Sequence, residues 1–597
     1  MNCKKSRLVL IFIIDALIIL LGSIYINLPG VYFDSAITDF IASTIVNPQI
    51  DNQTGMMMSH VGIPLIGNIY YGTLSMFAQI AVLLFFRGTV FTIRIVYLLY
   101  VIICVDLIFL IIYRAVGKYW IGICGLVLCG TSISILTLTR TQYDIMLPGV
   151  CFFLLAILFL EKIITSKNDN HLALAKLFYL MGLFLGVSFY DYFCFLFFVP
   201  VIVFLAIKHN GHHLVYMIIS SIWGFLCGCS LYFCGFADSL ITNALGNTRL
   251  AFIVLMMFCT LFFAALAVPA CFFLRKKAIP YLIWKIYVIL LGLVFVAAIG
   301  IAVVCSQILI SKISSFSLGG VESRKTGSKT AFITHFFFLF YSLVSGQAAE
   351  LQINGVCTSV FGRLYFWIFL VITIVLVIMM IIKRERNKDR EFILWMMSFY
   401  LSFYICSIPL ISGMQEQHMV PLLFLMFPYI VISVCYLARE LKDVRYFAVG
   451  ILSSVFVIMN LIDTYSFYHE LNMTRGVGAY SEELNLLFEE AYGRSLKEKD
   501  VYFLVNPGVL PSFVYLTDNN IKVELLYGID GGFDTDKVSL IDEYLSDGYN
   551  VFLLSVYYDL DETIDDLNRN YDIVAEDKIN SYDSRGTLVY STAEIKE

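Results

Sequence analysis

Two carboxylates, Asp34 and Asp39, stand in the segment GVYFDSAITDFIASTIV, just after the first long apolar run of the chain. From Asp34 onward, isoleucines recur every fourth residue, which predicts a helix lying on the membrane with Asp39 on the side opposite its apolar stripe. Asp34 immediately precedes this helix, so it is expected either to cap the helix or to act as a base that takes a proton from a hydroxyl. A helix N-terminus would keep the carboxylate ionised in either case. On a helix the two side chains would point roughly 140° apart, which excludes a shared acid–base pair.

The composition defines the class of protein that positions these residues. Of 597 residues, 60% are hydrophobic and 14% are charged, which is typical of a multi-span membrane protein. The apolar runs predict a polytopic α-helical protein with about 13 transmembrane helices, the first of them a retained span rather than a cleaved signal. These runs begin near Leu8, Thr92, Ile121, Ile145, Leu172, Phe193, Leu214, Ala251, Tyr281, Leu364, Phe392, Met419 and Tyr446.

Basic residues predict the orientation in the cell membrane. Lys4, Lys5 and Arg7 place the N-terminus in the cytoplasm by the positive-inside rule, and the later basic clusters agree at every second connection. With an odd number of spans, the outer face holds the first loop (27–88), the turns TRTQYD and GMQEQH, a loop at about 311–363, and the tail.

The chain therefore divides into a membrane domain, 1–463, and an extracytoplasmic tail, 464–597. Apolar strand candidates in the tail alternate with two helical segments, 481–493 and 537–549, which predicts an α/β domain that folds by itself. The strand candidates are 501–505, 521–527, 550–558, 571–576 and 587–591. Acidic residues outnumber basic ones in the tail, which argues against nucleic acid as a partner. GIDGG, at 528–532, lacks the spacing of a nucleotide-binding loop and is interpreted as a turn.

Metal and redox chemistry have little support in the sequence. The 15 cysteines lie mostly in apolar runs and form no CxxC pair, so no zinc site is expected. No cofactor is required, although a divalent cation remains open. Asp15 and Asp106 fall inside apolar runs, where Arg7 or Arg114 is expected to neutralise them.

Several outer-face motifs resemble polytopic glycosyltransferases of the GT-C superfamily, in particular the protein O-mannosyltransferase-like and aminoarabinose-transferase-like branch. Asp34 matches the first residue of that family's acidic pair, and Ser35 replaces the Glu. HVGIPL keeps the final Pro-Leu of the loop motif, with His60 placed early. TIRIVYLL, with Arg94, and TRTQYD, with Arg140 and Asp144, resemble the next two motifs. Two further sites depart from the pattern: Asp191 stands where a Lys is usual, and Gln417 and His418 stand where an Arg-Tyr or Arg-His is usual.

The resemblance implies a GT-C-like fold and a transferase that takes a sugar from a polyprenyl-phosphate donor in the membrane lipid. Asp34 would be the catalytic base, and Arg140 with His418 or His60 would face the donor phosphate. Arg324, Lys325 and Lys329 are further phosphate candidates, or residues of a solvated loop. Arg94 and Asp144 would bind substrate, or form an ion pair that only shapes the fold. The acceptor, whether glycan, lipid or protein, is not encoded in a readable motif.

Two other functions fit the same sequence. A transporter of lipid-linked saccharide would carry charges along a path through the spans, whereas the charges here gather at the two ends of the spans. A catalytically silent relative would bind a lipid-linked sugar without turning it over, which the departures at Ser35 and Asp191 would explain.

Overall fold

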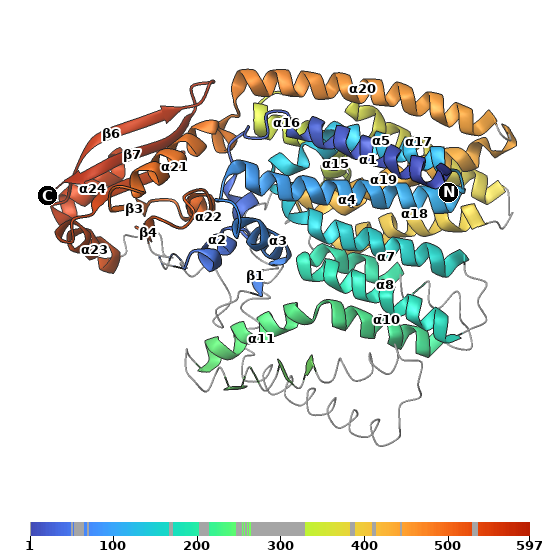
Figure 1. Cartoon of the computed structure of the whole chain (residues 1–597), viewed down its shortest axis with the longest axis horizontal. Coiled ribbons are helices and arrows are strands. Elements are labelled where there is room, and N and C mark those ends of the chain that lie inside the picture. The colour runs from blue at the N-terminus through green and yellow to red at the C-terminus, as the bar shows by residue number, and fades with distance from the viewer. Residues whose placement is uncertain are drawn as a thin grey trace.

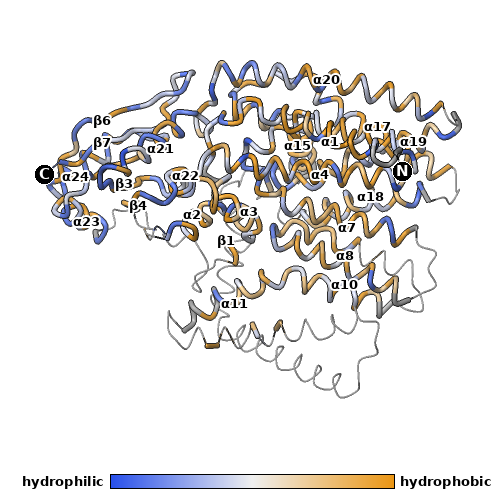
Figure 2. The backbone as a smooth tube through the Cα atoms, viewed as in Figure 1, coloured by the Kyte–Doolittle hydropathy of each residue, from blue (hydrophilic) through white to orange (hydrophobic). Residues whose placement is uncertain are grey.

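The structure is a computed structural model that describes residues 2–596, apart from 49, 51, 53–64, 69–70, 166–170, 202–203, 205–213, 246–252, 255, 257–258, 261, 264–328, 383–387, 409–413, 442–443 and 528–534. Long helices run side by side in a bundle, and a small sheet domain lies beyond one end of it (Figure 1). The N-terminus lies at the opposite end of the bundle. Hydrophobic residues dominate the bundle helices, whereas the helices of the sheet domain carry many hydrophilic residues (Figure 2).

The bundle confirms a polytopic helical membrane protein. Seven of its described helices are long and apolar enough to cross a bilayer, or nine if each of two bent helix pairs counts as one span. The span expected to start near Tyr281 falls outside the described residues, and the one expected near Ala251 is described only in part, where its residues are helical. The main helices of the bundle are α1 (Asn2–Ser23), α4 (Val90–Val116), α5 (Tyr119–Thr131), α7 (Leu147–Thr165), α8 (His171–Asp191), α10 (Leu214–Gly228), α11 (Ser230–Leu245), α17 (Gly362–Ile382), α18 (Lys388–Ser407), α19 (Val420–Leu437) and α20 (Val444–Thr474).

One bundle helix was not expected. Residues assigned to an outer loop form α15 (Lys329–Val344), and Phe336, Leu339 and Phe340 of this helix belong to the main hydrophobic core. The apolar run is shorter than a bilayer span, so a search for spans passes over it. Next follows α16 (Gln347–Asn354), and the turn before α17 is held by two buried carboxylates. Glu350 accepts hydrogen bonds from Thr358 and Ser359, and Asp463 accepts them from the backbone N–H groups of 360–362.

Glycines allow α8 and α10 to approach closely. Each of these helices carries two glycines one turn apart, Gly182 and Gly186 on α8 and Gly224 and Gly228 on α10. The two pairs lie at the contact between the helices. A Cβ added at Gly186 would lie 2.2 Å from the backbone oxygen of Phe225, and one at Gly224 would lie 2.0 Å from that of Tyr179. Backbone contact of this kind is a common basis of helix packing in membranes.

The loop 27–88, predicted to lie on the outer face and called the first outer loop here, consists in its described residues of short elements instead of one long amphipathic helix. It holds the 3-10 helix η1 (Phe33–Ala36), the short helix α2 (Phe40–Val46), the two-stranded sheet of β1 (Ile66–Asn68) and β2 (Tyr71–Gly72), and α3 (Leu74–Leu83). Helix α2 packs against α3 on one side and against a helix of the sheet domain on the other. Its residues from Phe40 to Thr44 are buried, so the helix has no solvated face.

The tail forms the predicted α/β domain. Its five-stranded sheet has the order β4-β3-β5-β7-β6, in which β4, β3 and β5 are parallel and β7 is antiparallel to both neighbours. The strands are β3 (Asp500–Leu504), β4 (Lys522–Leu525), β5 (Asn550–Val556), β6 (Val574–Tyr582) and β7 (Leu588–Lys596). The helices are α21 (Glu482–Ser495), α22 (Leu510–Leu516), α23 (Thr535–Ser546) and α24 (Asp561–Tyr571). Helices α22 and α24 were not expected, and β6 begins at 574 because α24 occupies the residues before it. The GIDGG segment lies outside the described residues.

The two faces of this sheet have different partners. Val501 and Phe503 belong to a separate core cluster together with residues of α23 and α24. Tyr502 and Leu504 belong to the same core cluster as the membrane bundle, together with residues of α21 and α22. This shared core argues against a tail that folds by itself. In addition, α20 runs unbroken through the expected boundary at 463/464, so the globular part begins at α21.

Candidate functional site

Asp34, the expected catalytic base, lies within η1, and its side chain is outside the described part of the structure. The interpretation of Asp34 as the cap of a following helix is wrong, because the α-helix begins only at Phe40 and Asp39 occupies its N-cap position. The Asp39 side chain makes no capping hydrogen bond either. The chain around Asp34 is therefore a tight turn rather than the start of a long helix.

Asp39, expected on the side opposite the apolar stripe, is instead completely buried. Its Oδ2 accepts a hydrogen bond of 2.7 Å from the Tyr97 hydroxyl, and the Gln79 amide nitrogen lies 3.5 Å away. Thr38 Oγ1 lies 3.4 Å from Oδ1 and 2.7 Å from Ser75 Oγ. The expectation failed because the residues that bury Asp39 come from α3, α4 and α22, which are distant in sequence.

Burial raises the pKa of Asp39 to about 6, since the charged carboxylate loses its hydration. The hydrogen bonds from Tyr97, Ser75, Thr38 and Gln79 act in the opposite direction. The result is an acid in the first outer loop whose protonation changes just below neutral pH.

The hydrogen-bond network continues into the tail domain. Tyr515 on α22 donates a 2.8 Å hydrogen bond to Gln79 Oε1, and its hydroxyl lies 3.3 Å from Thr92 Oγ1. Gln79 in turn faces Asp39, so three segments of the chain meet at one buried polar cluster. We call Asp39, Gln79, Tyr97 and Tyr515 the acid cluster.

Arg94, expected to bind substrate, holds the start of the first outer loop. Its guanidinium donates to the backbone oxygens of Ile26 at 2.7 Å, Pro29 at 2.6 Å and Gly30 at 3.2 Å. The side chain is almost fully buried at 3% exposure. It therefore supports the segment that leads to Asp34.

Arg140, expected to face the donor phosphate, has a similar role. It lies in the 3-10 helix η2 (Leu138–Arg140) and donates to the backbone oxygens of Gly22 at 2.8 Å and Ile24 at 2.7 Å. A third contact, of 3.2 Å, reaches the oxygen of Leu136, and the guanidinium lies over the ring of Tyr468. Three backbone oxygens thus take the two terminal nitrogens of this guanidinium, whereas its buried Nε has no hydrogen-bond partner among the described residues.

Asp144 connects this turn to the first outer loop. It lies in the 3-10 helix η3 (Gln142–Met146), is 2% exposed, and interacts with the Ser35 hydroxyl and with the charge of Arg94. Within the described part of the chain, its Oδ1 atom has no hydrogen-bond partner. A buried carboxylate oxygen of this kind, next in space to Ser35, is available to a substrate or to water.

His418 lies in η7 (Glu416–Met419), which packs against η3. Its Nδ1 is 2.9 Å from the backbone nitrogen of Gln415 and its Nε2 is 3.2 Å from the hydroxyl of Tyr192. Both ring nitrogens are therefore engaged within the protein. The neighbouring Gln417 carries a buried Oε1 that has no partner among the described residues.

Asp191, where the resemblance would place a Lys, has a structural role at the end of α8. Its Oδ2 accepts a 2.8 Å hydrogen bond from the N–H of Gly149, in the first turn of α7. A carboxylate at a helix N-terminus satisfies a free N–H group and interacts favourably with the helix dipole.

Three expected phosphate ligands, His60, Arg324 and Lys325, lie outside the described residues. Of Lys329, at the start of α15, only the backbone is described. Among the described residues, no group of three or more His, Cys, Asp or Glu is arranged to hold a metal.

The sequence interpretation missed Gln79, Tyr97 and Tyr515. Gln79 carried a usable signal, because it is the one amide in the apolar helix LSMFAQIAVL. Tyr97 lies one turn after Arg94 on α4, so its position facing the first loop could also have been inferred. Tyr515 gave no signal, since its contact depends on how the tail docks.

At the other end of the bundle, the expected neutralisation of Asp15 and Asp106 is wrong. Arg114 pairs with Glu161 at 4.0 Å, and Arg7 lies over the ring of Tyr119. Asp15 and Asp106 instead lie close enough to repel each other.

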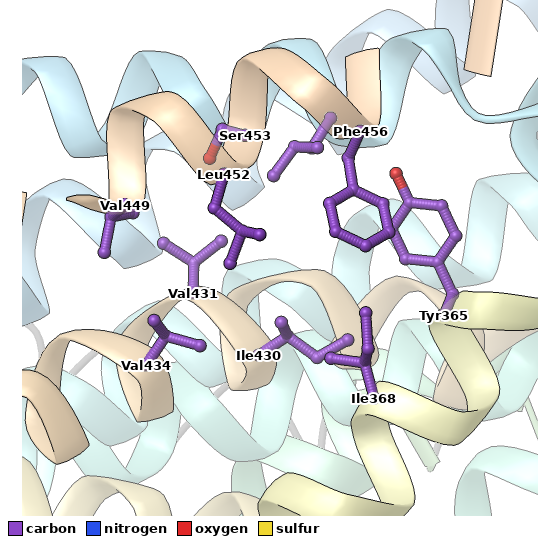
Figure 3. A pocket seen from close by; sticks show the side chains of 10 residues that line it. Tyr365, Ile368, Ile430, Val431, Val434, Val449, Leu452, Ser453 and Phe456 are labelled. Carbon is purple, nitrogen blue, oxygen red and sulfur yellow. The ribbon is translucent and has the colours of Figure 1, made fainter. Parts of the chain in front are cut away.

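A cavity of about 40 Å³ lies between α5, α17, α19 and α20, far in sequence from the first outer loop. Figure 3 shows aliphatic and aromatic side chains lining it, with the Tyr365 and Ser453 hydroxyls at its edge. The Tyr365 hydroxyl donates to Asn460 at 3.1 Å. The lining suits a hydrocarbon group and offers no acid or base for catalysis.

Comparison with known proteins found no matching family model and no matching curated protein. Solved structures that match the chain include ArnT from Cupriavidus metallidurans in the apo state, with a TM-score of 0.41 and 8% identity over 99% of this chain and 98% of that one. The same protein bound to undecaprenyl phosphate gives a TM-score of 0.39 and 8% identity over 97% of each chain. The apo oligosaccharyltransferase of Archaeoglobus fulgidus gives a TM-score of 0.41 and 10% identity over 93% of this chain and 69% of that one.

Proposed function

We propose that this chain is a membrane glycosyltransferase that transfers a sugar from a polyprenyl-phosphate-linked donor to a cell-envelope or protein acceptor on the outer face. The observation that carries the proposal is the convergence of the resembling motifs at one end of the bundle. Arg94 holds the backbone that leads to Asp34, Asp144 meets Ser35, and η3 packs against η7. These segments are far apart in sequence, yet they form one polar region beside the first outer loop.

The proposed chemistry is a displacement at the anomeric carbon of the donor sugar. Asp34 takes the proton of the acceptor hydroxyl, the hydroxyl oxygen forms the new bond to that carbon, and the bond to the phosphate oxygen breaks. The polyprenyl phosphate leaves with both electrons of the broken bond. Cationic groups that stabilise this charge would come from His60, Arg324 and Lys325.

The structure favours a supporting role for the other expected ligands. The terminal nitrogens of Arg94 and Arg140 donate to backbone oxygens, and both His418 nitrogens are engaged, whereas the buried Nε of Arg140 has no partner among the described residues. Asp144 supports Ser35, and because its Oδ1 has no partner among the described residues, it is the one of them best suited to contact a sugar hydroxyl.

The test is a transfer assay with purified protein and radiolabelled polyprenyl-phosphate sugar in lipid extract. Label that leaves the lipid in the wild type, and stays on it in the Asp34→Asn variant, supports the proposal. Label that remains on the lipid with every acceptor fraction tested would refute it.

One observation favours a second candidate, a silent relative that binds a lipid-linked sugar. Asp191 caps α7 where the resembling enzymes carry a Lys, so one cation is replaced by a carboxylate already engaged in the fold. Donor binding without any release of label would support this candidate.

A further inference from the structure

Tyr515 brings a hydroxyl of the tail domain into the first outer loop. Its side chain is fully buried, donates to Gln79 Oε1 at 2.8 Å, and lies 3.3 Å from Thr92 Oγ1. The tail therefore contributes a polar contact as well as apolar surface at this interface.

The contact fixes the orientation of the Gln79 amide. An amide group has one carbonyl oxygen and one NH₂ group, and Tyr515 donates to the oxygen. The NH₂ group is then directed to Asp39 Oδ2 at 3.5 Å and to the oxygen of Ile93 at 3.4 Å. The reversed amide would bring two oxygens together at Asp39 and again at Ile93, and it would lose the hydrogen bond that Tyr515 now donates to Oε1.

We propose that Tyr515 is a positioning residue through which the tail domain sets the proton affinity of Asp39 in the first outer loop. Tyr515 makes no hydrogen bond to Asp39 within the described structure, so its hydroxyl acts through Gln79, which contacts both residues. Without Tyr515 the Gln79 amide can rotate, and the ionised carboxylate loses a donor. The tail is therefore part of the acid cluster.

Four other titratable groups interact electrostatically with Asp39. Tyr97 and Tyr100 face it from α4, Asp144 from η3, and Asp191 from the end of α8. None of these residues contacts the Tyr515 hydroxyl within the described structure, so the loss of this hydroxyl changes only its contacts with Gln79 and Thr92, and of these two residues only Gln79 contacts Asp39.

Docking of the tail does not depend on the Tyr515 hydroxyl. Asn52 donates to the oxygen of Ile521 at 2.7 Å and accepts from the N–H of Val523 at 3.0 Å. Asn519 donates to the oxygen of Asn47 at 2.7 Å. The variant Tyr515→Phe keeps these contacts and the ring packing, so it removes one hydroxyl from a docked domain.

The experiment follows the carboxyl absorption of Asp39 by infrared spectroscopy during a pH titration of the full-length protein in lipid nanodiscs. The Asp39→Asn variant assigns the band. In Tyr515→Phe the midpoint should rise by about half to one pH unit, because a hydrogen bond to the ionised form lowers a pKa. Gln79→Leu should raise the Asp39 midpoint by a similar amount. The double variant Tyr515→Phe/Gln79→Leu should have a midpoint close to that of either single variant.

Tyr502→Phe is the matched control. Its ring packs 4.9 Å from that of Phe513 on α22, yet it lies outside the acid cluster, so the midpoint should stay in place. An unchanged midpoint in Tyr515→Phe would overturn the inference. Equal midpoint shifts in Tyr515→Phe and Tyr502→Phe would also overturn it, because they would indicate a general loosening of the interface. Additive shifts in the Tyr515→Phe/Gln79→Leu double variant would do the same, because they would show that the two residues act on Asp39 independently.

The catalytic consequence rests on the proposed function. If the chain is a transferase, the acidic limb of its rate profile should move with the Asp39 midpoint in Tyr515→Phe, while KM for the donor is unchanged. A wild type without transferase activity would end the proposed function and leave the titration result intact. An active wild type whose midpoint ignores Tyr515 would end only the inference.

Discussion

Asp34 and Asp39 are only five residues apart, but we expect Asp34 to act as the base and Asp39 to act as a buried acid. If Asp34 takes the acceptor proton, Asp34→Asn should lower the transfer rate by about two to four decades, because the amide cannot accept that proton. Donor binding and thermal stability should barely change. Transfer at the wild-type rate in this variant would remove the base assignment and favour the silent relative.

Asp39 should make stability depend on pH. Its folded pKa of about 6 lies above the ordinary value of 3.8, so the folded state binds the proton more tightly than the unfolded state. The associated stabilisation is complete below pH 4 and is lost as the pH rises through 6, by about 3 kcal/mol in total. Melting curves from pH 4 to pH 7 should show this decline, and Asp39→Asn should flatten it. A decline of equal size in both proteins would assign it to other groups.

Arg140 should matter for stability more than for donor affinity. Arg140→Ala leaves the buried oxygens of Gly22 and Ile24 without their donor, which should cost about 3 kcal/mol or more. Arg140→Lys should recover only part of this stability, since an ammonium group lacks the planar set of donors of a guanidinium. Melting temperature and donor affinity, measured together, separate the two roles: a weaker donor affinity at unchanged melting temperature would restore the phosphate contact.

Among the elements, the glycines of α8 and α10 provide a direct test of helix packing. Gly186→Ala places a Cβ 2.2 Å from the oxygen of Phe225, so the helices must separate, at a cost of about 1–3 kcal/mol. Gly450→Ala on α20 is the matched control, because nothing lies within 4 Å of its added Cβ. It should stabilise the protein by about 0.5–1 kcal/mol through helix propensity. The melting temperatures of Gly186→Ala and Gly450→Ala, measured in the same detergent, test this prediction. Equal changes in melting temperature in the two variants would refute the close contact between α8 and α10.

Predictability from sequence varied with the range of the contacts involved. The strands of the tail and the long spans were found, since each carries its own apolar pattern. The buried position of Asp39 was not predicted, because an isolated helix would leave this side chain in solvent and the elements that cover it are distant in the chain. Arg94 and Arg140 were found as important residues, but their partners are backbone oxygens, which no residue pattern reveals.

For the whole molecule, the sidedness of the membrane remains a prediction. The tail should be cut by protease added to intact cells, because the loop charges place the N-terminus in the cytoplasm. Antibody against an N-terminal tag reports the fragment that remains. Protection of the tail in intact cells, with cleavage in inverted vesicles, would reverse the topology.

The shared core of the tail and the first outer loop has a consequence for biosynthesis. Gln79 is made early and Tyr515 is made 436 residues later, so the first loop is complete long before its partner exists. Through most of translation the faces of α2 and α3 that later meet α22 are without that cover. A chain whose synthesis stops before α22 therefore has all its membrane helices but lacks the tail residues that complete the acid cluster. Assembly of this cluster in the first loop depends on a segment near the other end of the chain.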